Sequence, residues 1–214
     1  MNPMNLSSIN SIKPYHDAGL NKLYGLLFCD STDLYKSATQ PTGYPWDTLL
    51  AENPDLGIVQ AISVDETLET RPQILAYNLL LAKGFHVHAK ELLGVIIEVA
   101  VGDGLDVLAA FKDGTCRYIN HTEKMLVWDT QTDKSNQLVS QLFASSMTVV
   151  HRIGPWDQGR TSFPTAGMIK LTFLVSDGLY FGLGPFDALQ RDPMAGPVIQ
   201  SAVQLMTYLV DQAI

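Results

Sequence analysis

Asp106 and His121 are the residues whose types and spacing suggest acid–base chemistry in this chain. They lie near the two ends of the stretch LDVLAAFKDGTCRYINH, residues 105–121, with Asp113-Gly114 between them. Asp-Gly between two alternating segments predicts a β-hairpin, because both residues of a two-residue turn need a positive φ. That turn pairs the carboxylate directly with the imidazole across the hairpin. A carboxylate that orients an imidazole is half of many general acid–base sites.

The same pair also has a structural interpretation, which we favour. Opposite charges that face each other at a sheet edge contribute roughly a few tenths of a kcal/mol. The sequence places no Ser or Cys beside the pair, and Glu98 joins it only if the preceding GDG turn has three residues. The catalytic alternative is a hydrolase or isomerase that uses Asp106 and His121, with Arg117 or Arg160 holding an anionic substrate.

The loop GPWDQGRTSFP, residues 154–164, carries candidate binding residues. Trp156, Asp157 and Arg160 combine an aromatic ring, an acid and a guanidinium on a segment stiffened by Pro and Gly. That composition is typical of recognition loops and interface anchors. The alternative is an ordinary connection in which the Trp packs into the core and the Asp–Arg pair braces the turn.

Metal and cofactor chemistry have little support in the sequence. His86 and His88 share one side of an extended stretch, a spacing that occurs in metal sites, but no third ligand is evident. We therefore predict that the protein binds no metal. A metal-dependent protein that uses His86 and His88 ranks third among the hypotheses. Cys29 and Cys116 lie far apart and are expected to be free, buried thiols. None of the nucleotide, hydrolase, redox or zinc-protease motifs occurs, so no cofactor is predicted.

The order of helix and strand patterns along the chain predicts an α+β fold that must position these residues. We expect an antiparallel sheet built from a four-strand meander and a later hairpin, covered on one face by two or three helices. Residues 56–64 could form a strand or a helix. Residues 1–14 are expected to be a flexible arm and residues 15–214 a single domain. The predicted helices cover residues 18–28, 46–52, 70–83, 132–150 and 194–213, and the meander strands cover residues 92–101, 105–112, 115–121 and 125–129.

The composition favours a homo-oligomer, with a dimer as the first expectation. Apolar residues make up 46% of the 214 residues, but charged residues make up only 17%, against about 25% in an average soluble domain. Burial against a second copy would reduce the surface that charges must cover, although a surface rich in Ser, Thr, Asn and Gln would do the same. A candidate subunit contact is the nearly uncharged outer face of the last helix: Gln200, Ser201, Gln204, Thr207 and Tyr208.

Charge and hydropathy restrict the partners. The net charge is −8, and no Lys/Arg cluster occurs along the chain, which argues against nucleic acid and anionic membranes. The N-terminus has no signal-peptide pattern, and the longest apolar stretch, ELLGVIIEVAV, is too short for a membrane span, so a cytoplasmic location is expected. The leading hypothesis is a cytoplasmic, homo-oligomeric binding or assembly module without chemistry of its own. A small-molecule ligand is a further partner considered.

Overall fold

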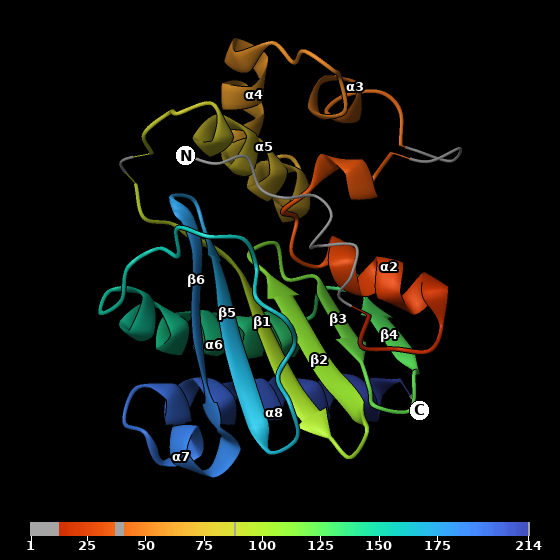
Figure 1. Ribbon diagram of the computed structural model, residues 1–214, viewed down its shortest axis with the longest axis vertical. Coiled ribbons are helices and arrows are strands. Elements are labelled where there is room, and N and C mark those ends of the chain that lie inside the picture. Colours follow the sequence, from red (N-terminus) through yellow and green to blue (C-terminus); the bar gives the residue numbers. More distant parts are fainter. Residues whose placement is uncertain (1–12, 37–40, 88, 214) are drawn as a thin grey trace.

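Six antiparallel strands form one sheet, in the order β4-β3-β2-β1-β5-β6 (Figure 1). The computed structural model describes residues 13–36, 41–87 and 89–213. The first four strands form a meander, and the β5–β6 hairpin adds to the other edge of β1. The predicted α+β fold, a four-strand meander with a later hairpin, is therefore confirmed. The strands are β1 (Leu92–Val101), β2 (Gly104–Phe111), β3 (Cys116–Ile119), β4 (Met125–Trp128), β5 (Met168–Val175) and β6 (Gly178–Pro185).

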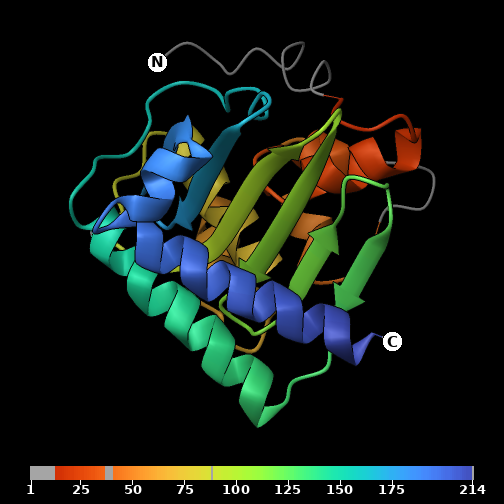
Figure 2. The same cartoon turned by 90° about the horizontal axis from the view of Figure 1, so that it is seen from below.

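Helices cover both faces of the sheet. α6 (Asp133–Val150) and α8 (Ala195–Gln212) run antiparallel and side by side across one face (Figure 2). On the other face lie α2 (Ala18–Leu26) and α5 (Thr70–Ala82), with α4 (Leu56–Ser63) packed against α5. The predicted layer is right for α6 and α8, but the prediction omitted the second layer. The remaining helices are short: η1 (Thr32–Leu34), α3 (Trp46–Leu49) and α7 (Phe186–Arg191).

Local side-chain caps explain where α6 and α4 begin. The Thr132 hydroxyl accepts from the Ser135 backbone N–H, and the Ser135 hydroxyl accepts from the Thr132 N–H, which closes a capping box at α6. The Asp55 carboxylate accepts from the Gly57 and Ile58 N–H groups. This cap satisfies donors that only a helix start leaves free, and it fixes the ambiguous apolar stretch as helix α4.

β1 is buried on both faces because it lies in the middle of the sheet. Val95 and Ile97 point into the core under α6 and α8, whereas Leu93 and Ile96 point into the core under α2 and α5. A strand with two covered faces reads as a continuous apolar run rather than an alternating one. Glu98 interrupts that run and is fully buried, on the α2 side of the sheet.

The two-residue turn predicted at the β2–β3 hairpin is wrong. Phe111 and Thr115 close the hairpin, since the Phe111 N–H donates to the Thr115 carbonyl at 2.9 Å, so the loop has three residues. Gly114 adopts a φ of +84°, which suits the last position of such a loop, and the Asp113 carboxylate accepts from the Thr115 N–H. Every cross-strand pair is shifted by one residue as a result, so that Leu108 faces Tyr118.

The predicted N-terminal arm, residues 1–14, lies outside the described residues except for its last two. No helix in the described part of the chain is long and apolar enough to cross a membrane.

Candidate functional site

The structure brings Asp106 and His121 together despite the shifted register. His121 Nδ1 lies 2.9 Å from Asp106 Oδ1, and the His121 backbone N–H donates to the same oxygen at 2.6 Å. The Tyr118 hydroxyl donates to Asp106 Oδ2 at 3.0 Å. The carboxylate thus holds the end of the hairpin through three contacts from β3 and the residues that follow it.

The surroundings of this pair supply little else for catalysis. The His121 side chain is 44% exposed. The GDG turn has two residues, which places Glu98 on the opposite face of the sheet. Arg117 donates to the Cys116 carbonyl and pairs with Asp129 at 2.7 Å, at the other end of β3. The structure therefore does not assemble Arg117 with the pair.

Neither cysteine provides an activated nucleophile. Cys29 and Cys116 are free and buried, as the sequence predicted. Burial raises the pKa of each thiol to about 12. A thiol with so high a pKa stays protonated near neutral pH and is a poor nucleophile.

The loop of residues 154–164 divides into an outer and an inner part. Trp156 is 36% exposed and lies edge-on against Phe181 of β6, with ring centroids 5.1 Å apart. Asp157 is exposed. Arg160 turns inward and pairs with Asp30, rather than bracing the turn through Asp157. The three candidate residues therefore do not form one site.

The inward part of this loop meets a buried charge network that the sequence did not reveal. Glu98 of β1 and Lys170 of β5 are direct cross-strand partners, with Nζ 3.4 Å from Oε2 and both side chains at most 1% exposed. The Tyr24 hydroxyl of α2 donates to Glu98 Oε1 at 2.6 Å. Lys170 Nζ donates to the carbonyls of Thr161 and Ser162 at 3.1 and 3.3 Å, which attaches the loop to the sheet.

Burial shifts both members of the central pair toward their neutral forms. Desolvation raises the pKa of the Glu98 carboxyl, although the Lys170 ammonium opposes that shift. Desolvation likewise lowers the pKa of Lys170, against the attraction of Glu98. Such a buried pair carries a desolvation penalty, and its contacts join β1, β5 and the loop of residues 154–164.

Arg160 is the most unusual cation of the network. Its Nε donates to Asp30 Oδ2 at 2.9 Å, and its guanidinium carbon lies 3.8 Å from the centre of the Phe28 ring. The side chain is 2% exposed. Within the described part of the chain, Arg160 Nη1 has no hydrogen-bond partner. Buried donors in native proteins are nearly always hydrogen-bonded, so we expect this nitrogen to have an acceptor.

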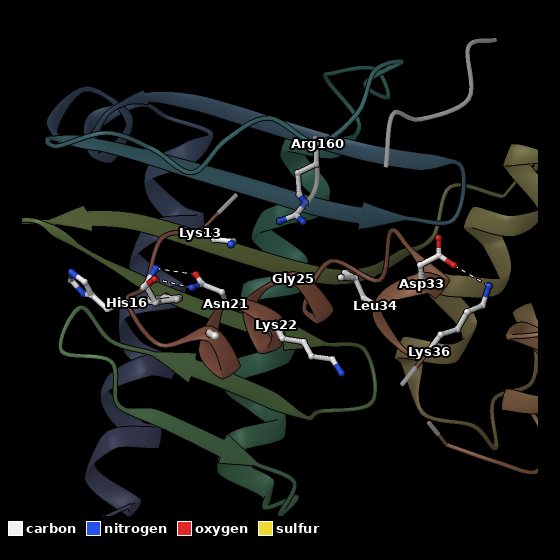
Figure 3. Close-up of a pocket in the computed structure, with 11 residues that line it drawn as sticks. Lys13, His16, Asn21, Lys22, Gly25, Asp33, Leu34, Lys36 and Arg160 are labelled. Carbon is white, nitrogen blue, oxygen red and sulfur yellow. Dashed lines mark hydrogen bonds and ion pairs between the residues drawn. The ribbon is translucent and has the colours of Figure 1, made fainter. Parts of the chain in front are cut away.

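Arg160 also lines a hollow of about 450 Å³ beside α2 (Figure 3). Lys13, Lys22 and Lys36 line the same hollow, and Asp33, which pairs with Lys36 at 2.9 Å, is the carboxylate among the lining residues. Four of the fourteen Lys and Arg residues of an acidic chain thus gather in one place. The sequence could not show this cluster, because Arg160 follows Lys36 by more than a hundred residues.

No group of three or more His, Cys, Asp or Glu side chains in the described part of the chain could hold a metal ion. His88, one of the two histidines considered as metal ligands, lies outside that part. The metal hypothesis therefore gains no support from the described residues.

Comparison with protein-family models, with curated proteins and with solved structures finds no match. Two features stand out: the basic hollow beside α2, and the outer surface of α6 and α8 on the opposite face of the sheet.

Proposed function

We propose that this protein is a homo-oligomeric binding module that associates through the outer faces of α6 and α8. A dimer is the oligomer that we favour. The observation that carries the proposal is the absence of charged residues from most of α6 and α8, apart from Asp133 and Lys134 at the start of α6 and Asp211 near the end of α8. Residues 135–150 and residues 193–210 contain no Asp, Glu, Lys, Arg or His. The two uncharged segments belong to helices that lie side by side (Figure 2).

The exposed side chains of this surface are small or uncharged. Ser140, Ala144 and Thr148 follow one side of α6, and Val203 of α8 is 48% exposed. Small residues allow close packing of helices, and depletion of charge is the compositional mark of an interface core. The remaining exposed positions are mostly amides: Asn136, Gln137, Gln141, Gln200 and Gln204.

The charge distribution favours a second copy of the chain as the partner at the α6/α8 surface. Two copies with a net charge of −8 repel each other wherever acidic surfaces approach. A two-fold contact through an uncharged surface avoids that repulsion, because each copy presents the same patch to the other. We accordingly propose the contact at the uncharged segments, residues 135–150 and 193–210.

Placement of like charges on this surface tests the proposal. In Gln141→Arg/Gln204→Arg, each copy would carry two new cations at the proposed contact, and we expect a dimer to dissociate. Gln60→Arg, on the exposed side of α4, is the matched control and should leave the assembly intact. Native mass spectrometry and light scattering report the multiple of the 23.5 kDa chain directly.

A monomeric wild-type chain would disprove the proposal, as would an oligomer unchanged by both arginines. Truncation of α8 is not a suitable test. Its inner side supplies Val198, Ala202, Leu205 and Leu209 to the core, so removal of the helix would unfold the protein.

Catalysis by Asp106 and His121 is the second candidate. The 2.9 Å contact that favours it holds Nδ1 on the carboxylate and leaves Nε2 as the nitrogen to exchange a proton with a substrate. If the protein hydrolyses chromogenic acetyl or phosphate esters, His121→Gln should abolish turnover. His151→Gln, at an exposed histidine beyond α6, should not. Equal turnover in both variants would remove this candidate.

A further inference from the structure

We propose that the hollow beside α2 binds a small polyanion, a molecule that carries phosphate or carboxylate groups. Arg160 would contact it at the inner end, and Lys13 and Lys22 would contact it at the rim. The proposal is independent of self-association, because α2 and the α6/α8 surface lie on opposite faces of the sheet.

The charge of the hollow is the first argument. Among the described residues, its lining carries four cations, of which Lys36 pairs with Asp33 and Arg160 pairs with Asp30. Lys13 and Lys22 are exposed and belong to no ion pair among the described residues. On a chain of net charge −8, such a concentration attracts anions to one place on the surface.

The buried guanidinium is the second and independent argument. Arg160 is held by Asp30 on one side and by the Phe28 ring on another, so its orientation is fixed. Figure 3 shows its guanidinium end directed from the loop toward α2. Nη1 remains without an acceptor among the described residues. A fixed guanidinium with a free donor suits a phosphate or carboxylate oxygen, because a charge-assisted hydrogen bond completes its coordination.

Size restricts the ligand class. A hollow of about 450 Å³ lies within the range of small-molecule sites. The cations come from separate segments, namely the residues before α2, α2 itself and the loop before β5, so a ligand with more than one anionic group can contact several of them. The buried Tyr15 adds an aromatic ring to the lining.

Calorimetric titration of the full chain with pyrophosphate and, separately, with citrate tests the proposal. We expect at least one of them to bind, with an affinity that falls as NaCl is added. Lys13→Gln/Lys22→Gln should weaken binding by about tenfold or more, the range of lost charge-assisted contacts. Lys83→Gln/Lys134→Gln removes the same charge from exposed positions outside the hollow and should leave the affinity within about twofold.

Arg160→Lys tests the inner end separately. It keeps a cation but removes the guanidinium fork, so binding should weaken while the thermal unfolding of the free protein shows that the fold remains. If this variant does not fold, the rim variants decide the question.

The outcomes separate the ligand classes. Binding of pyrophosphate alone assigns the site to phosphates, binding of citrate alone assigns it to carboxylates, and binding of both with the expected variant pattern assigns it to polyanions of either kind. Failure of both probes to bind would overturn the proposal, and so would equal affinity in the rim variant and the wild type. Capture of a poly-glutamate peptide with no response to either small anion would assign the surface to acidic protein segments and likewise overturn it.

Discussion

Two carboxylates on opposite faces of the same sheet show how burial changes the role of similar contacts. Asp106 and Glu98 each accept a hydrogen bond from a tyrosine hydroxyl, Asp106 from Tyr118 and Glu98 from Tyr24. Each also lies beside a basic side chain. Asp106 and its partners are partly exposed, whereas Glu98 lies in the middle of the sheet with no exposed surface.

The difference decides which contacts stabilise the fold. At the exposed pair, water replaces a lost contact, so each contact contributes little. At the buried pair, water cannot enter without disrupting the packing, so loss of one partner leaves an uncompensated charge in a poor solvent. We therefore expect the Glu98 network to determine how α2, the loop of residues 154–164 and the sheet fit together.

The largest effect should come from Lys170→Met. Removal of the ammonium leaves the buried Glu98 carboxylate unpaired, and we expect a loss of about 3–5 kcal/mol in the free energy of unfolding. Urea denaturation measures this loss. Glu98→Gln/Lys170→Met, which keeps an acceptor for the Tyr24 hydroxyl, should be more stable than Lys170→Met. A double variant no more stable than the single one would contradict this account of the network.

The loss in Lys170→Met should also depend on pH. Burial raises the pKa of Glu98 and the Lys170 ammonium lowers it, so the variant should have a still higher pKa in the folded state. A carboxyl whose folded pKa exceeds its unfolded value, about 4.3, contributes stability below that value and loses it as the pH rises through the folded pKa. The deficit relative to the wild type should therefore be small in acid and largest at mildly alkaline pH. Urea denaturation across that range should show no such slope for Glu98→Gln/Lys170→Met.

Matched tyrosine substitutions compare the two faces with the same change of one oxygen. Tyr24→Phe removes the donor to the buried Glu98 carboxylate and should lower the free energy of unfolding by about 1.5–3 kcal/mol. Tyr118→Phe removes the donor to Asp106, where solvent reaches the carboxylate, and should lower it by less than about 1 kcal/mol. Thermal and urea unfolding of both variants measure the difference. Equal losses would show that exposure does not separate the two sites.

Local patterns predicted the elements of the fold, and long-range pairing determined the rest. Periodicity placed α6 and β1 within a residue or two, because each pattern lies within a single element. The place of β5 beside β1 depends on the packing of the whole sheet. The register of the β2–β3 hairpin was missed because the Asp113 side chain stabilises a three-residue loop that the Asp-Gly pair alone does not predict.

The candidate sites divide in the same way. The contact between Asp106 and His121 was predictable, because both residues belong to one hairpin. A register shift of one residue still leaves their side chains within hydrogen-bond distance. Arg160 was recognised as a binding candidate, but its partner Asp30 lies 130 residues earlier in the chain. No sequence spacing reports such a pair. The charge network becomes visible only when α2 is placed over the sheet.

The smallest effect should come from His121→Gln. The His121 side chain is 44% exposed. When the ring is replaced, the Asp106 carboxylate still accepts hydrogen bonds from the backbone N–H of residue 121 and from the Tyr118 hydroxyl. We expect a loss of about 0.2–1 kcal/mol by urea denaturation, as for other exposed cross-strand pairs. Asp106→Asn should lose more, because it weakens all three contacts at once. A loss above about 2 kcal/mol in His121→Gln would mean that the imidazole supports the hairpin end more than its exposure suggests. A small loss of stability would mean that the backbone and Tyr118 contacts of Asp106 hold the hairpin end, and that the fold does not require the imidazole.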